Sequence, residues 1–142
     1  MKAAAVRRFV VDASVAVAWC FEEDATEVSE RALAILQAGA EVAAPALWPL
    51  EVANALLVAE RRKRISTSNR IALMDRLASF PIELDPADTA RAFGQVVSAA
   101  HQHGLTVYDA AYLELASRTA LPLATLDDEL RRAARRIGVP LV

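Results

Sequence analysis

Short apolar segments alternate with longer segments of helical periodicity along this chain, and that alternation limits the folds it can adopt. Strands are expected at 8–11, 41–44, 81–84, 121–125 and 139–142. Helices are expected at 27–38, 48–64, 67–80, 85–102, 107–118 and 127–136. Parallel strands need crossover connections, which are usually helices, and these helices cover both faces of the sheet. The pattern therefore predicts a three-layer α/β/α sandwich with a central, mostly parallel five-stranded sheet.

The composition predicts a single globular domain over 1–142. The chain is 55% hydrophobic and 24% charged, with only 4 Gly and 6 Pro, which excludes a disordered chain. Its net charge of −2 gives no general attraction to nucleic acid, so a polyanion would have to meet local basic patches. The single cysteine, Cys20, excludes an intrachain disulfide framework and is typical of a reducing compartment.

The N-terminal segment shares one feature with signal peptides, because Lys2, Arg7 and Arg8 precede apolar residues. Asp12 interrupts that apolar stretch, and no convincing small-residue cleavage site follows it. No uninterrupted apolar run approaches the length of about 18 residues that a membrane span requires. We therefore expect a cytoplasmic protein that does not enter a membrane.

Four acidic residues stand where an apolar strand ends or a helix begins: Asp12, Glu51, Asp109 and Asp127. Burying a carboxylate is costly, and several carboxylates brought together repel one another unless a cation binds them. In parallel sheets ligands bind beyond the carboxyl ends of the strands, and Asp12 and Asp127 each follow an expected strand. If those two strands are neighbours, the carboxylates share one crevice. A hard divalent metal such as Mg²⁺ would then be the natural cation, and phosphoryl chemistry the natural reaction.

Three of these acids also have an ordinary structural explanation when each is taken alone. Asp12 would serve as a helix N-cap with help from Ser14, and Glu51 would complement a helix dipole in its first turn. Asp127 and Asp128 both lie in the first turn of an expected helix, which is an ordinary place for an acid. The pattern Thr125-x-x-Asp128 resembles a capping box, which assigns the cap to Asp128 and leaves Asp127 for the crevice.

Asp109 is harder to explain as a purely structural residue. On a helix it lies beside Tyr112 on the inward apolar stripe, where a chain that needs only solubility would not place an acid. Glu114, by contrast, is expected to face away and to pair with Arg118 four residues on. Asp109 therefore carries most of the argument for a functional acidic site.

The segments around these four acids resemble the four motifs of PIN domains. The first is Phe-Val-Val-Asp-Ala-Ser-Val around Asp12, and the second is Pro-Leu-Glu-Val-Ala-Asn at 49–54. The third is Tyr-Asp-Ala-Ala-Tyr at 108–112, and the fourth is Ala-Thr-Leu-Asp-Asp-Glu-Leu at 124–130. The resemblance covers essentially the whole chain, and its size is similar to that of the VapC-type toxins of bacterial type II toxin–antitoxin systems.

The resemblance implies an endoribonuclease that depends on Mg²⁺ or Mn²⁺, is often a homodimer, cleaves RNA and is inhibited by a cognate VapB-like antitoxin. It implies catalytic and metal-binding roles for the acidic residues Asp12, Glu51, Asp109 and Asp127. It implies supporting roles for the polar residues Ser14, Asn54 and Thr125.

Two basic clusters, at 61–64 and 131–136, are most simply solvated helix faces. The alternative is contact with RNA phosphates, which a chain of negative net charge would have to localise in this way. The second cluster is favoured slightly because it follows Asp127 on the same expected helix. The candidate RNA contacts are Arg131, Arg132 and Arg135.

Two other functions stay open at this point. Asp12 at the end of the first strand suits the nucleophile of an aspartyl phosphotransferase or phosphatase, although the sequence Asp-Ala-Ser lacks the second Asp that haloacid-type phosphatases use. The other alternative is a catalytically silent PIN-like binding module in which the acids only cap helices.

Overall fold

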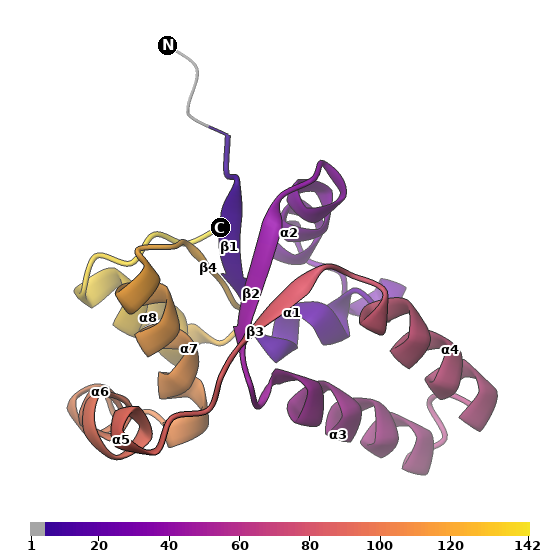
Figure 1. Ribbon diagram of the computed structural model, residues 1–142. Coiled ribbons are helices and arrows are strands. Elements are labelled where there is room, and N and C mark those ends of the chain that lie inside the picture. Colours follow the sequence, from indigo (N-terminus) through magenta and orange to yellow (C-terminus); the bar gives the residue numbers. More distant parts are fainter. Residues whose placement is uncertain (1–4) are drawn as a thin grey trace.

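A computed structural model describes residues 5–142; Lys2 lies outside them. Four parallel strands form one sheet in the order β3-β2-β1-β4 (Figure 1). They are β1 (Arg8–Val11), β2 (Glu41–Pro45), β3 (Ile82–Asp85) and β4 (Leu123–Ala124). Figure 1 shows helices α1–α4 on one side of the sheet and α5–α8 on the other. The predicted α/β/α layering and parallel sheet are therefore confirmed.

The fifth strand expected at 139–142 is reduced to a single parallel bridge between Leu123 and Leu141. Pro122 and Pro140 flank this bridge and have no amide hydrogen to donate to a ladder. Their carbonyls accept instead, from the amides of Val10 at 2.9 Å and Leu123 at 2.8 Å. Pro122 also lacks this donor just before β4, which is Leu123–Ala124 rather than the expected 121–125.

The helices lie close to their expected positions, with two main differences at their ends. Their bounds are α1 (Ala13–Ala18), α2 (Glu27–Gln37), α3 (Trp48–Arg61), α4 (Thr67–Ala78), α5 (Thr89–Arg91), α6 (Val97–His103), α7 (Val107–Thr119) and α8 (Asp128–Arg136). A π-helical segment, Ala92–Val96, joins α5 to α6, and a 3₁₀ turn, Glu22–Asp24, follows α1. The helix expected from residue 85 begins only at Thr89, because Asp85 still belongs to β3 and Asp88 caps α5. Helix α3 ends at Arg61 rather than 64, and the chain turns at Lys63 with φ +60°.

The core is built around β1, which is buried on both faces of the sheet. Phe9, Val10 and Val11 have no exposed surface. Side chains from both helical layers pack on the sheet in one cluster, among them Val15, Leu56, Tyr112, Leu113 and Leu130. Burial of each large apolar side chain contributes about 1.5–3 kcal/mol. The strand therefore delivers the next residue, Asp12, to the edge of a rigid core. Within 5–142, no helix is both long and apolar enough to span a membrane.

Candidate active site

The strand order reverses at the carboxyl ends of β1 and β4, and we call this edge of the sheet the β1–β4 crevice. The chain runs outward from β1 through β2 to β3 and then returns to β4 on the other side of β1. This reversal is where ligands bind in parallel α/β sheets. The condition left open by the sequence is met, since β1 and β4 are neighbours with Val10 opposite Leu123 and Val11 opposite Ala124. The amide of Asp12 continues the pairing by donating to the Ala124 carbonyl at 2.9 Å.

Asp12 is held in the crevice by two hydroxyl groups. Ser14 Oγ and Thr125 Oγ1 each donate to Asp12 Oδ2 at 2.7 Å, and the Asp12 residue is only 5% exposed. Asp12 stands at the N-cap position of α1, but its side chain makes no cap hydrogen bond. Burial raises the pKa of Asp12, and the charge of Asp127 adds to the increase, while the two hydroxyls act in the opposite direction. The cap explanation does not account for this carboxylate.

The loop after β4 both contacts Asp12 and positions the first turn of α8. The hydroxyl of Thr125 accepts from the amide of Asp127 at 3.1 Å, and Ser14 Oγ accepts from the amide of Leu126 at 3.1 Å. Asp127 Oδ1 accepts from the amide of Leu130 at 2.8 Å, so Asp127 is the N-cap of α8. The expected Thr125–Asp128 capping box is therefore wrong, because the buried Thr125 hydroxyl is already used by Asp12 and the Asp127 amide. Asp128 is exposed in the first helical position.

Glu51 lies in the first turn of α3, partly buried, where its carboxylate meets α7. The hydroxyl of Tyr112 donates to Glu51 Oε1 at 2.6 Å. Burial raises the pKa of Glu51, and the charges of Asp12 and Asp109 add to the increase, whereas the Tyr112 hydroxyl opposes it. The sequence pattern placed Tyr112 on an apolar stripe and gave no signal for this polar role.

Asp109 lies in the first turn of α7, whose N-cap hydroxyl, Thr106 Oγ1, accepts from the Asp109 amide at 3.0 Å. Burial raises the pKa of the Asp109 carboxyl, and the charges of Asp12 and Asp127 raise it further. Glu129 also acts on it, although the sequence gave it no role. The only sequence signal for Glu129 was its place in the acidic run 127–129, at the start of α8.

All four predicted acids lie near one edge of the sheet. The charge of Asp12 acts on Glu51 and Asp109, and the charge of Asp127 acts on Asp12 and Asp109. Among the neighbouring charges of residues 5–142, carboxylates alone act on the pKa values of Asp12, Glu51 and Asp109, and all of them raise these values. A sequence model of the PIN domain matches residues 9–136, which is most of the chain.

The chain belongs to the PIN domain family.

Relatives and solved structures agree with this assignment. The chain is 34% identical over 123 residues to Ribonuclease VapC3 from Pyrobaculum aerophilum, which covers 87% of this chain and 92% of that protein. The crystal structure of PAE2754 from the same organism superposes with a TM-score of 0.68 at 27% identity, covering 93% of this chain and 87% of that one. The structure of VapBC2 from Rickettsia felis, bound to a DNA fragment from its promoter, shares the fold with a TM-score of 0.63 at 14% identity, covering 94% and 96%.

The acidic site of this PIN domain suits a cation that keeps part of its water shell. Within 5–142, no three Asp, Glu, His or Cys side chains stand close enough together to enclose a metal ion by themselves. The four acids are nevertheless oxygen donors that repel one another, and in the described chain none of them forms an ion pair with Lys, Arg or His. Mg²⁺ typically binds through one or two carboxylates and retains several waters. The donor set therefore fits a hard divalent cation bound partly through water.

The remaining predicted residues lie at different distances from the acidic centre. Asn54 is exposed one turn after Glu51, and within the described chain its side chain makes no hydrogen bond. Arg131 donates to the carbonyl of Thr125 at 3.0 Å, which fixes the loop that carries the site. Arg132 and Arg135 are exposed on α8.

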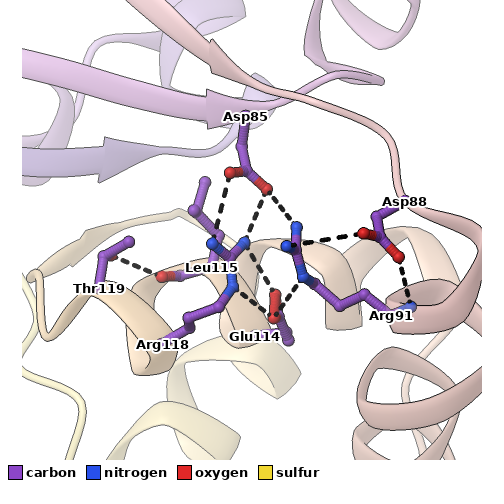
Figure 2. Close-up of polar contacts among 7 residues, drawn as sticks. All are labelled: Asp85, Asp88, Arg91, Glu114, Leu115, Arg118 and Thr119. Carbon is purple, nitrogen blue, oxygen red and sulfur yellow. Dashed lines mark hydrogen bonds and ion pairs between the residues drawn. The ribbon is translucent and has the colours of Figure 1, made fainter.

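A network of five charged residues fixes α7, the helix that carries Asp109 and Tyr112 (Figure 2). Its members are Asp85, Asp88, Arg91, Glu114 and Arg118. Arg118 Nη2 contacts Asp85 Oδ2 at 2.7 Å, and Arg118 Nε contacts Glu114 Oε1 at 2.7 Å. Arg91 from α5 contacts the same two acids at 3.1 Å and 3.6 Å. The expected Glu114–Arg118 pair is confirmed, but Glu114 does not face solvent, since its side chain is only 10% exposed. The network ties α7 to the end of β3 and to α5.

Proposed function

We propose that this PIN domain is a metal-dependent endoribonuclease that hydrolyses RNA phosphodiester bonds at the site formed by Asp12, Glu51, Asp109 and Asp127. The observation that carries the proposal is the position of these carboxylates near the carboxyl ends of β1 and β4, where among residues 5–142 none of them forms an ion pair with Lys, Arg or His. The identity of 34% with a protein named a ribonuclease supports the same chemistry.

Mg²⁺ or Mn²⁺, when bound, supplies an activated water and neutralises charge that develops on the phosphate. The residues of the chain hold the geometry. Asp12 is fixed by the hydroxyls of Ser14 and Thr125, so its carboxylate needs little reorganisation. Asp109 and Asp127 stand at the N-termini of α7 and α8, where the helix dipoles also favour a phosphate group.

The RNA backbone needs a positive surface outside the acidic crevice. Arg132 and Arg135 are exposed on α8, which starts directly after Asp127, and within residues 5–142 neither forms an ion pair. We assign phosphate contacts to these two residues. Arg131 is engaged with the carbonyl of Thr125, so its first role is to hold the loop.

An antitoxin partner is part of the proposal, because an unrestrained ribonuclease would harm its cell. An apolar groove of about 360 Å³ lies between α3, α4 and β3, with Trp48, Val52, Leu77 and Phe80 in its walls. It starts on the same turns of α3 that carry Glu51, and the buried Trp48 Nε1 has no acceptor among the described residues. A VapB-like segment with apolar anchors would fill this groove and extend a basic side chain to the acids.

The aspartyl phosphotransferase alternative is disfavoured by the surroundings of Asp12. A nucleophilic carboxylate must reach an incoming phosphorus atom, but Asp12 is 5% exposed and its Oδ2 already accepts two hydroxyls. Incubation with acetyl phosphate would phosphorylate the protein on Asp12 if this alternative held. Absence of metal-dependent RNA cleavage would favour the silent binding module.

The decisive test is RNA cleavage by purified protein with Mn²⁺, with Mg²⁺ and with EDTA. Wild type should cleave only with metal, and Asp12→Asn and Asp109→Asn should lose about 100-fold or more in rate, the scale of removing a catalytic electrostatic group. Asp75→Asn is the matched control, because Asp75 is an exposed acid on α4. Cleavage in EDTA, or equal cleavage by all four proteins, would contradict the proposal.

Expression in cells tests the toxin role and the partner. Wild type expressed alone in the cytoplasm should arrest growth, whereas Asp12→Asn and Asp109→Asn should not. With the cognate antitoxin co-expressed, Ala53→Arg in the wall of the groove should restore the arrest. Light scattering of the purified protein tests the homodimer, which remains part of the proposal.

A further inference from the structure

Tyr112 combines a buried ring with a hydroxyl that ends at the acidic crevice. Its residue has no exposed surface and belongs to the main core cluster. Its hydroxyl donates the 2.6 Å hydrogen bond to Glu51 Oε1, which joins α7 to α3 across 61 residues of sequence. The sequence predicted that this side chain packs in the core, and packing alone does not require its hydroxyl.

The hydroxyl has a partner that matters for the site. A buried tyrosine needs a hydrogen-bond acceptor, and a backbone carbonyl would be sufficient. Here the acceptor is a carboxylate that Asp12 and Asp109 repel. A hydrogen bond from a hydroxyl to a carboxylate is stronger than one between neutral groups, and it restricts the orientation of the carboxylate.

The hydroxyl contacts Glu51 directly and lies near enough to Asp12 for the charge of Asp12 to act on it. The charges of both Asp12 and Glu51 act on Tyr112, and the amide of Ala13 acts on Tyr112 as well as on Asp12. The 2.6 Å contact has the hydroxyl as donor and the Glu51 carboxylate as acceptor.

We propose that Tyr112 is a positioning residue of the acidic site: its hydroxyl holds Oε1 of Glu51 and leaves Oε2 for the cation or for a water in its shell. This inference rests on the proposed metal-dependent function. Tyr112 does not touch the substrate and acts only through Glu51. Groups that orient metal-binding side chains typically change metal affinity by about 10–100-fold when they are removed.

The test is the dissociation constant for Mn²⁺, measured by calorimetry without RNA. Tyr112→Phe keeps the ring in the core, and the partly exposed Glu51 carboxylate can take up water in place of the hydroxyl. We expect the dissociation constant to rise about 10-fold or more in this variant. Tyr108→Phe is the matched control, since Tyr108 lies on the same helix and is 66% exposed, and it should bind Mn²⁺ as wild type does.

Variants of Glu51 show whether Tyr112 acts through this carboxylate. In a double-variant cycle, Tyr112→Phe should weaken Mn²⁺ binding no further once Glu51→Gln is present. Additive effects would overturn the inference, because Tyr112 would then act elsewhere. Glu51→Asp keeps the charge but withdraws it from the hydroxyl, and it should weaken binding like Tyr112→Phe. It serves as a second test if Tyr112→Phe does not fold.

The outcomes separate this inference from the proposed function. If wild type and Tyr112→Phe bind Mn²⁺ equally while Glu51→Gln binds more weakly, the positioning role is overturned and the metal site stands. If wild type binds no Mn²⁺, the positioning role and the metal dependence of the proposed ribonuclease are both overturned.

Discussion

The Thr125 hydroxyl donates a 2.7 Å hydrogen bond to Oδ2 of Asp12 and thereby joins the ends of β4 and β1 across 113 residues of sequence. Thr125 is completely buried and Asp12 is 5% exposed, so water cannot replace this contact. The same hydroxyl accepts from the amide of Asp127, which places the start of α8. One side chain therefore holds two of the four acids in the crevice.

Thr125→Val should destabilise the protein by about 1–3 kcal/mol, because a buried carboxylate and a backbone amide both lose a partner. Thr125→Ser keeps the hydroxyl and serves as the control, so it should lose much less. Urea denaturation of the three proteins measures both changes. Equal stability of the Val and Ser variants would show that the hydroxyl contributes nothing to the fold.

Asp109→Asn should stabilise the metal-free protein near neutral pH. The folded protein raises the pKa of Asp109, through burial first and the charges of Asp12 and Asp127 next. When the pKa is higher in the folded than in the unfolded protein, protonation of the carboxyl stabilises the fold. This stabilisation is complete below the unfolded pKa of about 3.9 and is lost as the pH rises through the folded pKa. Asn cannot ionise, so Asp109→Asn avoids this loss of stability. Its free energy of unfolding should exceed that of wild type near neutral pH and equal it at low pH.

The measurement is urea denaturation in EDTA, once near neutral pH and once at low pH. Asp75→Asn on α4 is the control for removal of an exposed acid. A stability difference between Asp109→Asn and wild type that does not change with pH would rule out this electrostatic account.

Divalent metal should stabilise wild type and leave Asp109→Asn nearly unchanged. A ligand that binds only the folded state adds about 2.7 kcal/mol at a concentration 100 times its dissociation constant. Thermal melts with increasing Mn²⁺ should therefore show a concentration-dependent rise in Tm for wild type. The same rise in Asp109→Asn would show that Asp109 is not part of the metal site. Melts with Ca²⁺ in place of Mn²⁺ measure the selectivity of the site between the two cations.

Much of the fold was readable from the sequence because its signals are local. The apolar strand 8–11 followed directly by Asp12 fixes both a central strand and the residue delivered to its end. Alternation of strands with helices then predicts a parallel sheet, and the acids that directly follow its strands, Asp12 and Asp127, lie at one edge. These features need no knowledge of which atoms touch.

Contacts between distant atoms could not be read in the same way. Periodicity places Tyr112 on an inward stripe, but it does not say that its hydroxyl reaches Glu51. The apolar segment 139–142 resembles a strand, yet Pro140 lacks the amide donor that a ladder needs. A third example is the choice between Asp127 and Asp128. Both acids stand at a helix start, and the sequence does not say which of them caps α8.

The pair Asp127 and Asp128 gives the last prediction, because the structure assigns the cap and the crevice to the same residue. Asp127 Oδ1 caps α8, while the Asp127 charge acts on Asp12 and Asp109. Asn caps helices as well as Asp does, whereas Ala loses about 1 kcal/mol. Asp127→Asn should therefore keep its stability and lose ribonuclease activity, and Asp127→Ala should lose both. Asp128→Asn should keep both, since Asp128 is exposed and does not provide the cap. Denaturation and RNA cleavage measured on the three variants check this pattern, and an inactive Asp128→Asn would mean that the neighbouring acid serves the site instead.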